Sequence, residues 1–169
     1  ITGGVGATAS GEAFGANYEL PNMSAYCETC AAIAQVYLNY RLFLLHGDSK
    51  YYDALERTLY NGVISGISID GGRFFYPNPL QSMGQHQRQA WFGCACCPSN
   101  AARFMPSVPQ YVYAVKDNNF YVNLFMGNIQ VSANYNGLVF VKGHEIFPEA
   151  VLPVHTVVDS FQSVLCIGC

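Results

Sequence analysis

Five of the chain's seven cysteines lie in two short segments, AYCETC from Ala25 and WFGCACCP from Trp91. A glutamate sits inside the first segment, and two cysteines are adjacent in the second. Adjacent cysteines form strained disulfides, so this clustering favours metal ligation or catalysis over a disulfide framework. Three thiolates and one carboxylate are a ligand set that suits zinc. The candidate zinc ligands are therefore Glu28, Cys30, Cys96 and Cys97.

The spacing within each segment limits how these side chains could meet. Residues two apart on a regular helix point about 200° apart, so Glu28 and Cys30 could share an ion only at or before the first helical turn. In the second segment, Pro98 favours an extended conformation for Cys97. Adjacent side chains of an extended chain point to opposite sides, so a bend is needed to bring both thiols to one ion.

Other uses of the same thiols stay open at this point. A structural zinc ribbon would use Cys27, Cys30, Cys94 and Cys97, although the gap of 64 positions (94 − 30) exceeds the roughly 15–20 residues usual for such sites. Cys27 and Cys30 also have the spacing of a thiol-redox pair. A non-catalytic, zinc-stabilised binding or interaction domain is the alternative to an enzyme.

The composition excludes several classes of partner. Hydrophobic residues make up 51% of the chain and charged residues 11%, with a formal net charge of −3. Nucleic acid binding needs a clustered basic surface, so we expect no nucleic acid partner. No apolar run reaches the roughly 18 residues of a membrane span, so we expect no membrane partner. Clustered thiols favour a reducing compartment, so we predict that the protein is located in the cytoplasm. The low fraction of charged residues and the lack of polar residues at the C-terminal end predict a segment of a longer protein.

The elements that must position the thiols are predicted to be helices in the first part of the chain and strands in the second. Residues 25–45 form an apolar helix that we expect to be buried on several sides, and a second helix follows over residues 50–64. Asp70, Gly71 and Gly72 indicate a hairpin turn. A short helix is predicted over residues 99–105, before Pro106.

Alternating apolar segments between residues 111 and 143 are separated by Asn- and Gly-containing turns, which predicts an antiparallel meander. From His144 onward the pattern shows no clear period. We therefore predict a helical segment over residues 1–106 and a β segment over residues 107–169, with a boundary near residues 106–109.

Four motifs resemble the family of retaining β-L-arabinofuranosidase glycoside hydrolases. They are SGEAFG, ELPNMSAYCETCA, YYDALERTLYNGVISGISIDGGRFFYPNPL and RQAWFGCACCPSNAARF, and the likeness runs over residues 1–128. It implies that the two or three helices belong to an (α/α)₆ barrel, which β-sandwich modules follow. It also implies a zinc ion held by one glutamate and three cysteines, one of which is the nucleophile.

The resemblance carries individual roles onto this chain. It implies zinc ligation by Glu28, Cys30, Cys96 and Cys97, with Cys96 as the nucleophile. Glu12, in SGEAFG, would be the general acid/base, and Tyr76, in FFYPNP, would contact the sugar. The implied substrate is an L-arabinofuranoside carbohydrate. Because two or three helices cannot close the barrel, the expected partner is the remainder of the barrel or a second copy of the chain.

Overall fold

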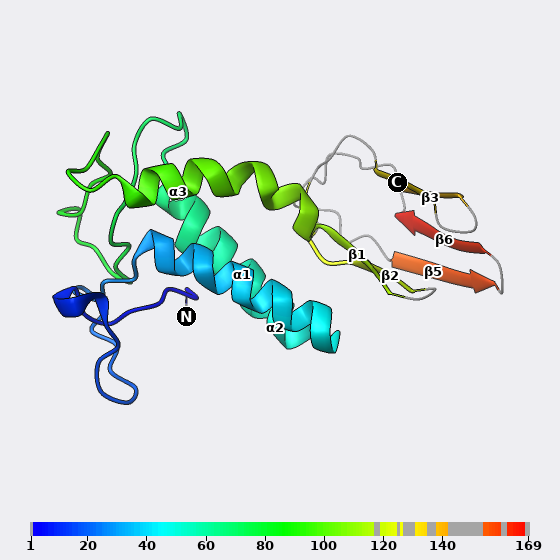
Figure 1. The fold of residues 1–169 in the computed structure, drawn as a ribbon, viewed down its shortest axis with the longest axis horizontal. Coiled ribbons are helices and arrows are strands. Elements are labelled where there is room, and N and C mark those ends of the chain that lie inside the picture. Colours follow the sequence, from blue (N-terminus) through cyan, green and yellow to red (C-terminus); the bar gives the residue numbers. More distant parts are fainter. Residues whose placement is uncertain are drawn as a thin grey trace. The chain divides into compact units, whose positions relative to one another are not determined.

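The computed structural model describes residues 2–116, 119–124, 126, 131–134, 138–141, 154–159 and 162–167. Its contacts divide the chain into two compact units, Ile1–Pro109 and Gln110–Cys169. The first unit contains the helices α1 (Thr29–His46), α2 (Ser49–Thr58) and α3 (Cys96–Phe104), whereas the strands belong to the second (Figure 1). None of the described helices is long and apolar enough to cross a membrane.

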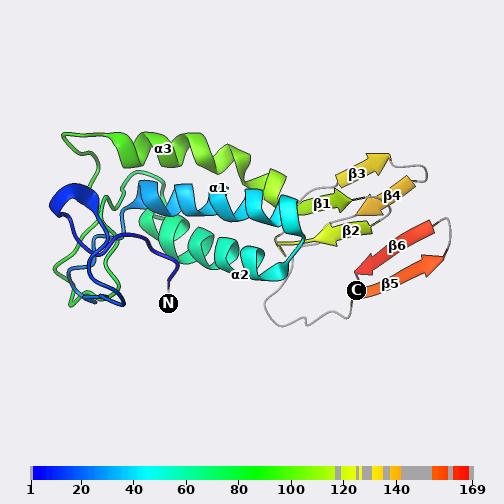
Figure 2. The same ribbon diagram turned by 60° about the horizontal axis from the view of Figure 1, so that its bottom comes forward.

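The predicted helical hairpin is confirmed, with α1 and α2 lying side by side (Figure 2). Gly47 ends α1 in the left-handed region at φ 69°, and its N–H donates to the Phe43 carbonyl at 2.7 Å. The Asp48 carboxylate then accepts from the Lys50 N–H at 3.0 Å and caps α2. The second helix continues as a π-helical turn, Leu59–Val63, and a 3₁₀ turn, Ile64–Gly66.

The start of α1 lies four residues later than predicted. Glu28 pairs instead with Pro77 in an antiparallel bridge, and the Asn78 N–H donates to the carbonyls of Tyr26 and Cys27 at 3.1 Å each. These contacts hold the chain extended before Thr29, so the helix cannot begin at residue 25. The predicted turn at residues 70–72 is confirmed by a bridge between Ile67 and Phe74 that encloses it.

The core of the first unit lies between the three helices and the π-helical turn. Its fully buried side chains include Ile33, Val36, Leu55, Leu59, Val63 and Phe104. The Tyr37 ring meets the Phe104 ring edge-on with centroids 5.5 Å apart, which joins α1 to α3. One expectation is wrong within the described structure, because Leu38 and Leu45 of α1 are 54% and 72% exposed. The other two helices cover only part of α1.

The short third helix begins earlier than predicted and overturns the expectation for Cys97. We expected Pro98 to keep Cys97 extended, but Cys96 and Cys97 are the first two residues of α3 and Pro98 is the third. Proline is tolerated in the first helical turn because the N–H groups there have no helical acceptor. The bend that the two thiols need is therefore the helix start itself. After Phe104 the chain continues as a 3₁₀ segment, Met105–Tyr111.

The described strands of the second unit form three antiparallel pairs. β1 (Tyr113–Lys116) pairs with β2 (Asn119–Val122), and β3 (Val131–Asn134) pairs with β4 (Leu138–Val141). β5 (Val154–Asp159) pairs with β6 (Gln162–Ile167). The antiparallel pairing of β1 with β2 and of β3 with β4 is confirmed, but the described residues form these as separate two-stranded sheets and show no β2–β3 pairing of a continuous meander. The last pair was not predicted, because the sequence after His144 shows no clear alternation.

Replacing Leu55 with alanine tests the core between the helices. Leu55 is 0% exposed, so Leu55→Ala should lower the free energy of unfolding by about 2–5 kcal/mol. The matched control is Leu45→Ala, at a position that is 72% exposed, where the change should stay within about 0.5 kcal/mol. Urea denaturation followed by circular dichroism measures both, and equal losses in the two variants would contradict this assignment of the core.

Candidate metal centre

The end of the extended segment places Glu28 and Cys30 on the same side of α1. Glu28 directly precedes the helix with ψ 137°, and Cys30 is the second helical residue. The 200° separation of a regular helix therefore does not apply to this pair, as the spacing argument required. Glu28 is 8% exposed, which is unusual for a carboxylate without a charged partner.

Thr29 fastens this helix start to the segment that carries Tyr76. The Thr29 N–H donates to the Tyr76 carbonyl at 3.0 Å. The Thr29 hydroxyl lies 3.0 Å from the Phe75 carbonyl and 3.2 Å from the Tyr76 carbonyl, and it donates to both. Thr29 is 2% exposed, so these bonds are shielded from water. The backbone of Tyr76 is thus fixed against the residue that lies between Glu28 and Cys30.

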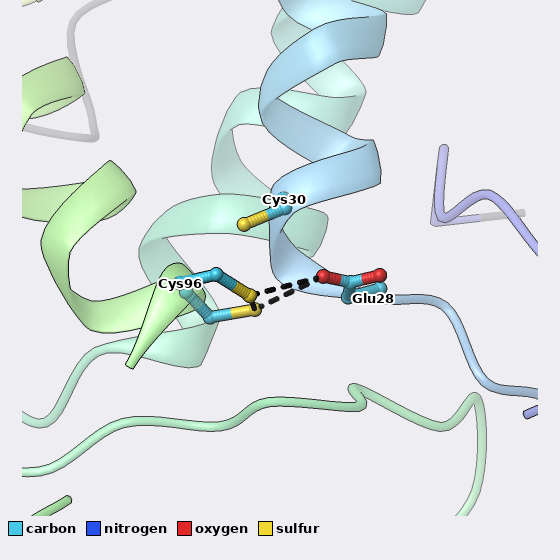
Figure 3. Close-up of side chains that lie close together, drawn as sticks. Glu28, Cys30 and Cys96 are labelled. Carbon is cyan, nitrogen blue, oxygen red and sulfur yellow. Dashed lines mark hydrogen bonds between the residues drawn. The ribbon is translucent and has the colours of Figure 1, made fainter. Parts of the chain in front are cut away.

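The first turn of α3 completes the cluster. One ligand atom from each of Glu28, Cys30, Cys96 and Cys97 lies within 4.8 Å of the others. Figure 3 shows Glu28 and Cys30, at the start of α1, pointing toward Cys96 of α3. The Cys96 and Cys97 sulfur atoms lie 3.5 and 3.4 Å from Glu28 Oε1, and the Cys97 thiol donates to it. The two sulfur atoms are 3.7 Å apart. These four residues are the set that the sequence predicted.

The separations among Glu28, Cys96 and Cys97 match the edges of a tetrahedral zinc site. With Zn–S bonds of about 2.3 Å and a Zn–O bond of about 2.1 Å, a tetrahedron has S···S edges of about 3.8 Å and S···O edges of about 3.6 Å. The observed S···S distance is 3.7 Å, and the two S···O distances are 3.5 and 3.4 Å. Three thiols and one carboxylate are also a donor set that zinc accepts. These three separations fit a tetrahedral divalent ion, and Cys30 would supply the fourth ligand, since its sulfur lies within 4.8 Å of the other ligand atoms.

Burial shapes the acidity of the thiols. Burial is the main cause that raises the pKa of Cys30 to about 11, and it also raises the pKa of Cys97 above its ordinary range. A thiol with a raised pKa is protonated at neutral pH and is a poor nucleophile. A divalent cation has the opposite effect, because it deprotonates a coordinated thiol.

Tyr76 lies against Cys96, one of the two partly exposed thiols of the cluster. Its hydroxyl accepts a hydrogen bond from the Cys96 thiol at 2.8 Å and donates to Cys94 Sγ at 3.9 Å. The hydrogen bond with Cys96, followed by burial, raises the pKa of Tyr76. The Tyr76 ring meets the Phe92 ring edge-on at 5.4 Å. Cys97 is 1% exposed whereas Cys96, like Cys30, is partly exposed, so a reactant could approach Cys96 but not Cys97.

Glu12 lies outside the four-residue cluster and is linked to it by a residue that the sequence reasoning missed. It ends the 3₁₀ turn Ser10–Glu12 with φ 49°, and its side chain is exposed. The Tyr26 hydroxyl donates to Glu12 Oε1 at 3.1 Å, and the Tyr26 and Tyr76 rings lie 6.3 Å apart. Burial, followed by the hydrogen bond to Glu12, raises the pKa of Tyr26. Its sequence position, two residues before Glu28, was the available signal.

Cys27 and Cys94 do not join the cluster, so the ribbon set is not assembled. Cys27 is 3% exposed, and a side chain at Gly4 would place Cβ 2.9 Å from Cys27 Sγ. Cys94 is exposed. Burial raises the pKa of Cys27 as well. All five cysteines of the two sequence segments are free thiols in the described structure, including the Cys27 and Cys30 pair.

The helical unit is similar to part of known glycoside hydrolases. A solved structure described as a glycoside hydrolase is 30% identical to this chain, with a TM-score of 0.77 over 88% of this chain and 29% of that one. Residues 1–110 match the model of the β-L-arabinofuranosidase, GH127 catalytic domain, and the chain therefore belongs to this family. The predicted fold class, part of an (α/α)₆ barrel followed by antiparallel strands, is confirmed.

Named relatives agree with this assignment. The non-reducing end β-L-arabinofuranosidase of Bifidobacterium longum subsp. longum is 41% identical, over 69% of this chain and 20% of its own length. A solved GH127 β-arabinofuranosidase is 62% identical, with a TM-score of 0.78 over 87% of this chain and 23% of that one. The GH127 β-L-arabinofuranosidase from Geobacillus stearothermophilus T6 is 41% identical, with a TM-score of 0.79 over 88% and 25%. The chain thus spans less than a third of each relative.

Removing the Thr29 hydroxyl should weaken metal binding at the cluster. Thr29→Val keeps the shape of the side chain but leaves the Phe75 and Tyr76 carbonyls without this donor, so affinity for Co²⁺ should fall roughly 10–100-fold. Thr29→Ser keeps the hydroxyl and should change the affinity for Co²⁺ by less than about 3-fold. Titration of the cobalt–thiolate absorption bands measures both. Equal affinity of wild type and Thr29→Val would show that the hydroxyl does not support the ligands.

Proposed function

We propose that this chain carries the nucleophile and the metal ligands of a retaining glycoside hydrolase that releases L-arabinofuranose from β-L-arabinofuranosides. The observation that carries the proposal is the cluster of Glu28, Cys30, Cys96 and Cys97, with ligand atoms within 4.8 Å and Cys96 accessible. Membership of the family supports the substrate class. The helical segment over residues 1–106 would contain the site, and residues 107–169 would begin a β module.

Glu28, Cys30, Cys96 and Cys97 would hold a zinc ion, which when bound keeps coordinated thiols deprotonated at neutral pH. The thiolate of Cys96 then has the charge and the accessibility that a nucleophile needs. Tyr76, whose hydroxyl lies 2.8 Å from Cys96 Sγ, would donate a hydrogen bond to that thiolate and hold its lone pair in place. We expect the same tyrosine also to contact the sugar.

The reaction would take place in two displacements. Cys96 Sγ attacks the anomeric carbon while Glu12 passes its proton to the glycosidic oxygen, so a C–S bond forms, the C–O bond breaks and the alcohol departs. In the second step the Glu12 carboxylate takes a proton from water as the water oxygen attacks the same carbon. The C–S bond breaks, the thiolate of Cys96 returns and L-arabinofuranose leaves. Two inversions at one carbon give net retention.

Metal analysis tests the ligand set. We expect one zinc ion per chain and a sulfur-rich coordination shell in X-ray absorption at the zinc edge. Glu28→Gln and Cys97→Ser should each lower zinc affinity by at least about 10-fold, whereas the matched control Cys94→Ser should retain it. Loss of zinc in the Cys94 variant together with retention in the Cys97 variant would favour a different site.

The catalytic roles are tested by kinetics in the full-length protein with a β-L-arabinofuranoside. Glu12→Gln should lower kcat by roughly 10²–10⁴-fold, and Cys96→Ser by more than about 10³-fold. The control Glu19→Gln changes a glutamate in the same loop, whose carboxylate accepts from the Ala16 N–H, and should leave kcat within about 3-fold. Zinc binding by wild type with unchanged turnover in Cys96→Ser would leave only the alternative of a zinc-stabilised, non-catalytic site.

A further inference from the structure

The backbone around Glu12 fixes where this residue begins but not where its carboxyl group points. Thr8 and Ala13 exchange N–H···O bonds of 3.2 Å each, and the enclosed turn places Glu12 at φ 49°. A non-glycine residue keeps such a conformation only when the surroundings hold it. The Glu12 side chain is exposed, however, and an exposed glutamate samples several rotamers. A further contact is needed to orient the carboxyl group.

Tyr26 supplies this contact. Its hydroxyl donates to Glu12 Oε1 at 3.1 Å across 14 residues of sequence. Tyr26 is itself held from two directions. Its carbonyl accepts from the Asn78 N–H at 3.1 Å, and its ring packs against the Tyr76 ring with centroids 6.3 Å apart and planes tilted by 45°. The hydroxyl that holds Glu12 is therefore positioned by the same segment, residues 75–78, that positions Tyr76.

We propose that Tyr26 is a positioning residue that orients Glu12 as the general acid/base, an inference that rests on the proposed function. The hydrogen bond occupies Oε1 and leaves Oε2 as the oxygen that carries and accepts the proton. When the proton passes from Oε2 to the departing alcohol, the phenol hydrogen bond stabilises the carboxylate charge that remains. Tyr26 exchanges no proton with substrate and touches no reacting atom.

The test uses Tyr26→Phe in the zinc-loaded, full-length protein, because phenylalanine keeps the ring and its contact with Tyr76. Two substrates are compared through kcat/KM, which reports the first displacement. Methyl β-L-arabinofuranoside needs protonation of its departing oxygen, whereas 4-nitrophenolate leaves without it. Tyr26→Phe should lower kcat/KM roughly 10–100-fold for the methyl glycoside and less than about 3-fold for the 4-nitrophenyl glycoside. A purely structural loss would lower both by the same factor.

Tyr18→Phe is the matched control, because Tyr18 is a tyrosine of the same loop region with 102% exposure. This variant should leave kcat/KM unchanged for both substrates. Equal losses for the two substrates in Tyr26→Phe, or no loss, would overturn the proposal. A second readout does not depend on turnover. The ¹³C chemical shift of the Glu12 carboxyl carbon, assigned through Glu12→Gln, should move in Tyr26→Phe and not in Tyr18→Phe.

The two readouts separate this inference from the proposed function. A wild-type protein that cleaves neither glycoside would refute the proposed glycosidase activity. The ¹³C chemical shift of the Glu12 carboxyl carbon would still decide whether Tyr26 holds Glu12. An active wild type whose Glu12 resonance is the same in Tyr26→Phe would refute the positioning role alone.

Discussion

The pairing of the segment before α1 with residues 75–78 is the constraint on which the site depends. Glu28 bridges Pro77, Asn78 binds the carbonyls of Tyr26 and Cys27, and Thr29 binds the carbonyl of Tyr76. These bonds delay the start of α1 until Thr29. The delay places Glu28 in extended chain and Cys30 in the first helical turn, which brings a carboxylate and a thiol to one point. Without the pairing, a regular helix would turn them apart.

The chemistry of the cluster follows from how closely it packs acidic groups. Two thiols lie 3.5 and 3.4 Å from one Glu28 oxygen, and Cys97 and Glu28 are almost completely buried. Ionising two or more of these groups in such a space would be opposed by desolvation and by like-charge repulsion. A divalent cation removes both obstacles, since it supplies the opposite charge and four bonds in place of hydration. The packing is therefore far better suited to a bound ion than to free thiolates.

The helices, the turns and the four-residue cluster could be predicted from the sequence because their signals are local. Apolar periodicity marked α1 and α2, and cysteine spacing marked the ligands. The details that failed depend on distant residues. Nothing near Ala25 in the sequence shows that Asn78 will keep this segment out of the helix. Pro98 was expected to keep Cys97 extended, but Cys97 lies in the first turn of α3. The exposure of Leu45 was missed because apolarity predicts burial without naming the partner that provides it.

Tyr26 was missed for the same reason, since its contact with Glu12 crosses 14 residues of irregular chain. Its position nevertheless has a physical consequence for the whole site. Glu12 stands on an exposed loop, and Cys96 stands on a helix from another part of the chain. The Tyr26 and Tyr76 ring centroids lie 6.3 Å apart, and their hydroxyls form hydrogen bonds with Glu12 and Cys96. Aromatic rings have few rotatable bonds, so the spacing between the proposed acid/base and the proposed nucleophile would be set by two rigid groups and not by the loop.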